Sequence, residues 1–164
     1  MDVEIVVFDW GDTLMRDLPQ YAGPMVDWPH VEVVPGAREA LETVSARYTC
    51  CVASNAGQSD AGQMALALQR VGLRRYFRHF WTSRELGANK PDLAFYAGVL
   101  ERLGRPAEAC VMVGNSLESD ILPARKADML TVWLAPASAR PSARAGYVIH
   151  HMRELPAALD ALSR

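Results

Sequence analysis

The sequence has little of what marks a membrane, secreted or nucleic-acid-binding protein. No stretch approaches the roughly 20 consecutive apolar residues that a membrane-spanning helix needs. The first residues, Met1-Asp2-Val3-Glu4, lack the basic segment that opens a secretory signal. The 17 lysines and arginines are offset by 19 acidic residues, and the net charge of -2 offers no bulk attraction to nucleic acid or anionic lipid. We therefore expect a cytoplasmic protein that needs neither nucleic acid nor a membrane as partner.

Cysteine is also scarce. The chain has 3 cysteines, Cys50, Cys51 and Cys110, and each lies within an apolar stretch. An odd number in such positions does not build a disulfide framework, so we expect small core residues with reduced thiols. What remains is the composition of an ordinary folded protein. The 164 residues, 50% of them hydrophobic and 22% charged, suit one globular domain over residues 1–164.

Short apolar runs alternate with amphipathic stretches along the chain. The run Val3–Phe8 is apolar except for Glu4, which is typical of a strand buried on both faces. Further strands are predicted at Thr49–Ala53, Phe80–Thr82, Cys110–Val113, Leu130–Leu134 and Tyr147–Ile149. Helices are predicted at residues 35–47, 59–71, 91–103, 119–127 and 155–162, with Pro91 in the first turn of the third. The alternation predicts an α/β fold with a mainly parallel sheet and helices on both faces.

Polar groups gather where ligands bind in such sheets, beyond the carboxyl ends of the strands. Residues 9–14 follow the first strand, residues 54–57 the second and residues 114–120 the fourth, while residues 89–92 precede the third helix. Together these segments supply carboxylates, a hydroxyl, a lysine and several helix N-termini. Hard oxygen ligands suit Mg²⁺, and lysine with helix N-termini suits a phosphate.

The four segments, in this order, resemble the motifs of the haloacid dehalogenase-like hydrolases, which are mostly phosphatases. Phe8-Asp9-Trp10-Gly11-Asp12-Thr13-Leu14 is similar to the first motif, and Ser54-Asn55 is similar to the second. Lys90-Pro91 resembles the third motif, and the segment from Gly114-Asn115 to Asp120 resembles the fourth. The resemblance covers nearly the whole chain. It implies a Rossmann-like three-layer α/β/α sandwich.

The resemblance also implies a reaction and a set of residues. Asp9 would be the nucleophile that forms an aspartyl-phosphate during Mg²⁺-dependent hydrolysis of a phosphate monoester, with Lys90 and Ser54 as its catalytic partners. The phosphate would be bound by Trp10, Gly11, Ser54, Asn55 and Lys90. The metal ligands would be Asp9, the backbone carbonyl of Gly11, Asn115 and Asp120.

Two positions depart from the family pattern. Gly11 stands where family phosphatases carry the acid that protonates the leaving group, a contribution of about 10²–10⁴-fold. Asp12 either substitutes for that acid or caps the loop. Asn115 stands where the fourth motif often has Asp, so we expect weaker Mg²⁺ binding than in an Asn115→Asp variant. The departures leave open a catalytically impaired phosphate- or metal-binding protein, a dehalogenase or a phosphonatase-type hydrolase.

The spacing of the motifs leaves no room for the separate cap domain that many family members carry. Predicted helices and strands fill most of the sequence between the motifs, and residues 15–34 remain as a flap or loop. Trp10, Tyr21 and Trp28 form either an aromatic rim for substrate or part of the core. The missing cap disfavours the dehalogenase and the phosphonatase, which resemble capped branches. An uncapped site would accept a small or bulky phosphorylated substrate, and the flap or a second copy in a homo-oligomer would cover it.

Overall fold

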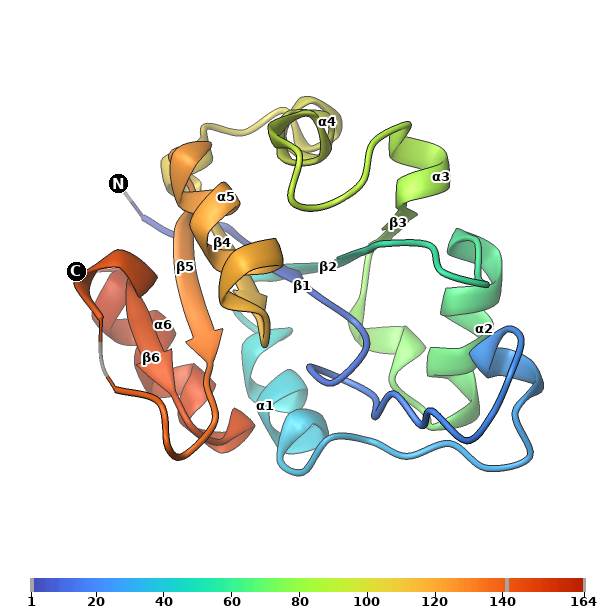
Figure 1. Ribbon diagram of the computed structural model, residues 1–164. Helices are drawn as coiled ribbons and strands as arrows, with labels where there is room; N and C mark the ends of the chain where they lie inside the picture. The colour runs from blue at the N-terminus through green and yellow to red at the C-terminus, as the bar shows by residue number, and fades with distance from the viewer. Residues whose placement is uncertain (1, 141, 164) are drawn as a thin grey trace.

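A computed structural model describes residues 2–140 and 142–163 and shows a six-stranded sheet (Figure 1). Every neighbouring pair of strands is parallel, in the order β3-β2-β1-β4-β5-β6. The strands are β1 (Ile5–Phe8), β2 (Thr49–Ser54), β3 (His79–Thr82), β4 (Cys110–Gly114), β5 (Leu130–Leu134) and β6 (Tyr147–Ile149). The predicted strands are therefore confirmed to within about two residues, the usual uncertainty of element ends.

Helices cover both faces of this sheet. Helices α1 (Ala37–Val44), α2 (Ala61–Arg70) and α6 (Leu155–Leu162) lie on one side in Figure 1, and α3 (Ser83–Leu86), α4 (Leu93–Leu103) and α5 (Leu122–Lys126) lie on the other. Successive residues of β1 face opposite layers, since Val6 and Phe8 belong to one buried cluster and Ile5 and Val7 to another. The fold is the predicted Rossmann-like three-layer α/β/α sandwich.

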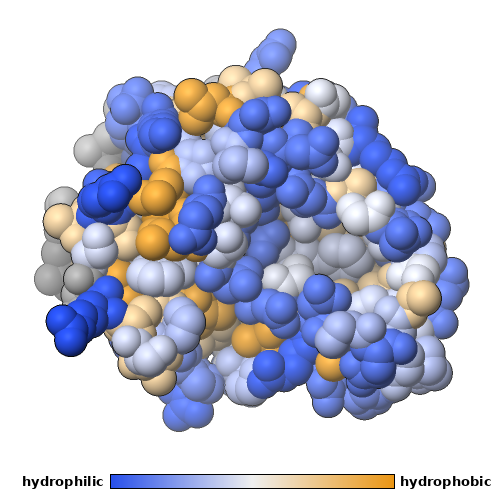
Figure 2. Space-filling view, viewed as in Figure 1, coloured by the Kyte–Doolittle hydropathy of each residue, from blue (hydrophilic) through white to orange (hydrophobic). Residues whose placement is uncertain are grey.

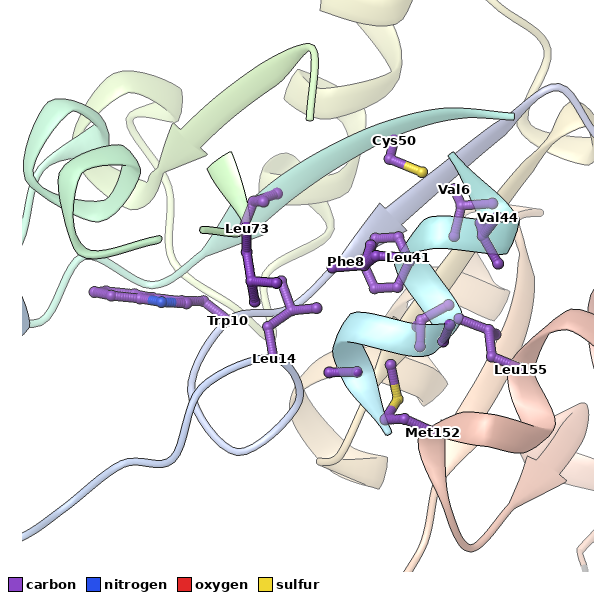
Figure 3. Close-up of a cluster of buried hydrophobic side chains, with 14 of the residues drawn as sticks. Val6, Phe8, Trp10, Leu14, Leu41, Val44, Cys50, Leu73, Met152 and Leu155 are labelled. Carbon is purple, nitrogen blue, oxygen red and sulfur yellow. The ribbon is translucent and has the colours of Figure 1, made fainter. Parts of the chain in front are cut away.

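The larger core lies between β1 and α1. Figure 3 shows Phe8 beside Leu41, with Val6 and Val44 grouped next to them. The rings of Phe8 and Phe77 also meet edge to face, with their centroids 5.7 Å apart. Because Phe8 is fully buried, Phe8→Ala would cost about 3–5 kcal/mol of stability. This packing holds β1 in place, and β1 carries the first motif at its end.

Two helix predictions need correction, and one helix was missed. The prediction that Pro91 lies in a first helical turn is wrong, because a turn closed by Asp92 N–H and the Asn89 carbonyl precedes α4. The helix expected over residues 119–127 begins earlier, as a π-helical turn, η4 (Leu117–Ile121), that leads into α5. Helix α3 was missed because four residues are too short to show a period. Its only sequence signal is the capping box of Thr82 and Glu85.

The segment 15–34 runs beside α2 and contains the 3₁₀ turn η1 (Met25–Asp27) (Figure 1). The Arg70 guanidinium at the end of α2 donates to the carbonyl of Val26 at 3.1 Å and to that of Trp28 at 2.6 Å. The indole N–H of Trp28 donates to the Gly23 carbonyl at 3.0 Å, which closes the flap on itself. The flap is thus fastened to the sandwich at α2.

Hydrophilic side chains predominate on the face shown in Figure 2, with smaller groups of hydrophobic ones between them. Within residues 2–140 and 142–163, no helix combines the length and the apolar character needed to cross a bilayer.

Candidate active site

The motif residues meet at the carboxyl ends of β1, β2 and β4. Strand β1 lies between the other two, where the strand order changes direction, which is the usual ligand position in open α/β sheets. The Asp9 backbone N–H donates to the Val113 carbonyl at 2.9 Å and so extends the β1–β4 ladder by one residue. Asp9 therefore stands on rigid backbone, with 9% of its surface exposed.

Lys90 links two buried carboxylates. Its ammonium nitrogen lies 2.9 Å from Asp9 Oδ1 and 2.7 Å from Asp120 Oδ1, and only 2% of the Lys90 side chain is exposed. Burial lowers the pKa of Lys90, but the nearby carboxylates of Asp9 and Asp120 outweigh it and leave the pKa raised. Burial, together with the charge of Asp9, raises the pKa of Asp120 to about 6 against the opposing effect of Lys90. The site thus keeps a permanent positive charge beside the predicted nucleophile.

Asn55 holds the backbone that carries this lysine. Its side-chain Oδ1 accepts the Lys90 backbone N–H at 2.8 Å, and its Nδ2 donates to the Lys90 carbonyl at 3.3 Å. Both ends of the amide are occupied in this way, so the Asn55 side chain positions Lys90 and is not free for phosphate. Ser54 lies beside it with a hydroxyl that donates to the Asn55 carbonyl at 3.3 Å.

Asp120 is held from several sides. The Ser116 backbone N–H donates to its Oδ2 at 3.1 Å. The Tyr96 hydroxyl donates to the carbonyls of Ser119 and Asp120. Burial raises the pKa of Tyr96, and the charges of Asp120 and Asp9 add to it, which keeps this hydroxyl protonated as a donor. Tyr96 was not predicted as a site residue, because from sequence it is one more aromatic on the apolar face of α4.

Gly114 leaves the room that Asp120 needs. A Cβ on Gly114 would overlap the Asp120 carboxylate and its Cβ. A glycine at the end of β4 therefore allows the close approach of the two segments.

Asn115 faces the oxygens of the first motif. With its amide nitrogen turned toward that loop, it donates to Asp9 Oδ2 at 3.0 Å, to the Gly11 carbonyl at 3.3 Å and to the Thr13 hydroxyl at 3.2 Å. With the amide turned over, its oxygen stands at the same distances from the Asp9 and Gly11 oxygens. Neighbouring ligands of an octahedral Mg²⁺, with bonds of about 2.1 Å, lie about 3.0 Å apart. These spacings fit a shared cation.

The candidate metal ligands carry little negative charge, but they suit Mg²⁺. Among the residues that the structure describes, no group of three or more His, Cys, Asp and Glu side chains could hold a metal ion. The set consists instead of two carboxylates, an amide and a backbone carbonyl, from Asp9, Asp120, Asn115 and Gly11. Mg²⁺ is usually held by one or two carboxylates and keeps several waters, so these four residues fit it.

A cavity of about 460 Å³ opens beside the first and second motifs. Trp10, Gly11, Ser54 and Asn55 line one side, and the flap contributes Asp17, Tyr21, Ala22, Gly23, Met25 and Trp28. The rings of Tyr21 and Trp28 lie 5.7 Å apart between centroids. Trp10 and Trp28 line this cavity and are also buried in the core. For these two side chains, both interpretations made from the sequence therefore apply.

On the side of the cavity formed by the strand ends, the backbone N–H groups of Trp10, Gly11 and Asn55 have no acceptor within residues 2–140 and 142–163. The Trp10 indole N–H, by contrast, is used by the Met15 sulfur at 3.3 Å. Backbone donors that gather at one place suit an anion.

The comparison with known proteins establishes the family to which this chain belongs. The family model of the haloacid dehalogenase-like hydrolases matches residues 11–128. The chain belongs to this family. The match confirms the family that the four motifs of the sequence predicted.

The curated relatives of this chain described next are longer proteins. A glyceraldehyde 3-phosphate phosphatase of Methanocaldococcus jannaschii is 42% identical over 65 residues, which are 40% of this chain and 28% of that protein. The pyrimidine 5'-nucleotidase YjjG of Escherichia coli is 36% identical over 102 residues, which are 62% of this chain and 44% of that protein. The chain thus spans less than half the length of these two relatives.

One solved structure matches nearly the whole chain. An uncharacterized protein from Listeria monocytogenes serotype 4b superposes with a TM-score of 0.85 at 27% identity, covering 98% of both chains. The arrangement of one sandwich without a large insertion therefore occurs in a second chain of the same size.

The structure also shows which contacts Asp12 makes. Asp12 has a left-handed backbone with φ of 59°, and its Oδ1 accepts the Asp17 backbone N–H at 3.0 Å. It lines a different cavity, together with Arg16 and Asn115, and not the cavity beside Ser54. Of the two sequence interpretations, capping of the loop is the one that this geometry supports.

Proposed function

We propose that this hydrolase cleaves phosphate monoesters in a Mg²⁺-dependent reaction, with Asp9 as the nucleophile that forms an aspartyl-phosphate. The observation that carries the proposal is the position of Asp9, between the Lys90 ammonium at 2.9 Å and the Asn115 amide at 3.0 Å. A carboxylate on rigid backbone, beside a fixed positive charge and an anion-binding cavity, is suited to attack phosphorus. The curated relatives support this, since those described are named as phosphatases or nucleotidases.

The chain supplies the phosphate site with charge and hydrogen bonds. Lys90 neutralises the phosphoryl group and the attacking carboxylate together. The backbone N–H groups of Trp10, Gly11 and Asn55 and the Ser54 hydroxyl bind the phosphoryl oxygens. Because these donors sit on strand ends and short turns, they need little rearrangement when the charge moves in the transition state.

A bound Mg²⁺ would complete the charge balance of the site. Asp9, the Gly11 carbonyl, Asn115 and Asp120 would hold it, and it would supply Lewis-acid stabilisation of the phosphoryl charge. The chain's own part is to hold the two carboxylates and the amide in place, which it does through Lys90, Ser116 and Thr13.

The leaving group would lie in the cavity between the first motif and the flap. This cavity accepts a small or a bulky phosphorylated substrate, and a second copy of the chain would shield it in a homo-oligomer. The reaction requires neither nucleic acid nor a membrane. The cytoplasmic location stays a prediction of the sequence.

A second candidate is a catalytically impaired phosphate- or metal-binding protein. Gly11 and Asn115 favour it, because each replaces an acid of the family pattern. A dehalogenase or phosphonatase has less support, because both resemble capped branches of the family. Phosphonatases also use a lysine of the cap, and the flap of residues 15–34 contains no lysine.

The deciding experiment measures phosphate release from an aryl phosphate, with and without Mg²⁺, by the wild type and Asp9→Asn. Turnover that needs Mg²⁺ and disappears in Asp9→Asn supports the phosphatase. No turnover across a panel of phosphate esters, with Mg²⁺ still bound by calorimetry, supports the impaired protein. Metal-independent halide release from a 2-haloacid would indicate a dehalogenase.

A further inference from the structure

There is room for a side chain at Gly11, where family phosphatases carry an acid. A Cβ built on Gly11 would meet only the Asp17 Cβ within 4 Å among the described residues beyond its chain neighbours, at 3.8 Å. That is an ordinary van der Waals distance. The Asp17 side chain therefore starts next to the place from which the family's acid would start.

The loop after β1 brings Asp17 back to this place. The Trp10 carbonyl accepts the N–H groups of Leu14 at 2.9 Å and Met15 at 3.2 Å, and Asp12 N–H donates to the Met15 carbonyl at 2.6 Å. The Asp12 carboxylate then accepts the Asp17 N–H at 3.0 Å. These bonds reverse the chain, so that Asp17 lies beside Gly11 despite the residues between them.

Asp17 lies at the cavity and is free to act there. It lines the cavity together with Trp10, Gly11 and Ser54. Asp17 is exposed to solvent, and its carboxylate forms no ion pair with any residue within 2–140 and 142–163. Asp12, in contrast, is committed to the loop.

We propose that Asp17 is the catalytic acid and base of this hydrolase, in place of the missing acid at Gly11. The inference rests on the phosphatase function proposed above. It makes Asp12 a positioning residue that fixes the backbone of Asp17.

The proton balance has two steps. As an Asp9 oxygen bonds to phosphorus, the bond between phosphorus and the leaving oxygen breaks, and that oxygen keeps the electron pair and takes the proton of the Asp17 carboxyl group. In the second step, a water oxygen attacks phosphorus and gives a proton to the Asp17 carboxylate. The bond between phosphorus and Asp9 breaks, its electron pair returns to Asp9, and inorganic phosphate leaves.

The test compares two esters in Asp17→Asn. An alkyl phosphate has a poor leaving group that needs the proton, whereas 4-nitrophenyl phosphate has a good one that does not. We expect kcat/KM for the alkyl ester to fall by about 10²-fold or more and kcat/KM for the aryl ester to fall far less. Because water attack also loses its base, the aryl ester should show a burst of nitrophenolate equal to the enzyme concentration, followed by slow turnover.

Two further variants separate catalysis from structure. Asp27→Asn removes an acid from the same flap that does not line the cavity and should leave both esters unaffected. Gly11→Asp in the Asp17→Asn background returns an acid to the family position, where a Cβ fits, and should restore alkyl-ester turnover.

The outcomes separate this inference from the proposed function. An Asp17→Asn variant whose alkyl-to-aryl ratio equals that of the wild type, with no burst, overturns the role of Asp17 alone. A wild type that turns over neither ester overturns the phosphatase function and this inference with it.

Discussion

The ammonium group of Lys90 donates to the carboxylate of Asp120 across 2.7 Å, and each side chain is only 2% exposed. Taking two charges out of water is costly, and the pair repays that cost only while both partners are present. Lys90 also bonds Asp9, so one cation compensates two buried acids. The stability of the site and its chemistry therefore depend on the same side chain.

Lys90→Met should abolish turnover and lower the free energy of unfolding by about 3–5 kcal/mol, because it leaves two carboxylates without their cation. Urea denaturation measures the loss. Asp120→Asn in the same background should recover part of the stability, since it removes one uncompensated charge. Lys126→Met, at an exposed lysine of α5, is the matched control. Equal losses at Lys90 and Lys126 would contradict the buried network.

Asn115→Asp should strengthen Mg²⁺ binding by about tenfold or more, because a full negative charge joins Asp9 at the cation. Without Mg²⁺ the same variant should unfold at a lower temperature than the wild type, since the added charge then repels Asp9. Calorimetric titration measures the rise in Mg²⁺ affinity, and thermal melts with and without Mg²⁺ measure the fall in melting temperature. Gln69→Glu adds the same charge at the far end of α2 and should change neither the Mg²⁺ affinity nor the difference between melting temperatures with and without Mg²⁺. Equal or weaker Mg²⁺ binding would place Asn115 away from the ion.

Arg70→Ala should release the flap, because its guanidinium holds the Val26 and Trp28 carbonyls. Hydrogen bonds to a charged donor contribute about 1.5–3 kcal/mol, so residues 15–34 should become sensitive to limited proteolysis. We expect KM to rise more than kcat falls, since the flap lines the cavity but carries neither Asp9 nor Lys90. Arg74→Ala is the control, because Arg74 bonds the Gln69 side chain instead. A flap that stays protected in Arg70→Ala would disprove this anchoring.

The cysteines should report unfolding. All three are free and buried, as the sequence predicted, and burial raises the pKa of Cys50 and of Cys51 from 9.0 to about 12. The native thiols should therefore resist iodoacetamide at pH 8.5, and urea should expose them. The folded chain keeps protons that the unfolded chain releases, so stability is complete below pH 9 and falls as the pH rises toward 12.

Cys51→Ala should reduce that alkaline slope of the free energy of unfolding, since one raised thiol pKa is removed. An unchanged slope in Cys51→Ala, or rapid labelling of the folded protein, would contradict a buried Cys51.

Much of the fold was legible in the sequence because its strands are continuous apolar runs and its helices have a regular period. Val3–Phe8 can be buried on both faces only in the middle of a covered parallel sheet, and the strand bounds followed from such runs. Helix starts were less certain. The start near Pro91 depended on a turn between Asn89 and Asp92, and a turn closed by one hydrogen bond leaves no periodic signal.

The motif positions Asp9, Ser54, Lys90 and Asp120 were also visible in the sequence, because ligands gather beyond strand ends whatever the details of packing. Their individual partners were not. That Asn55 holds Lys90, and that Tyr96 supports Asp120, depends on where residues far apart in the chain point after the sheet has formed.

The sequence by itself determined the class of fold, the edge of the sheet that carries the site and the absence of an acid at position 11. Only the tertiary structure decided which acid stands near that gap. Asp12 is one residue from Gly11, yet its left-handed backbone commits its carboxylate to the loop. Asp17 is further along the chain, but the reversal of the loop places its Cβ 3.8 Å from where a Gly11 Cβ would be. Distance along the chain is a poor guide here, because the hydrogen bonds of one turn determine where each side chain points.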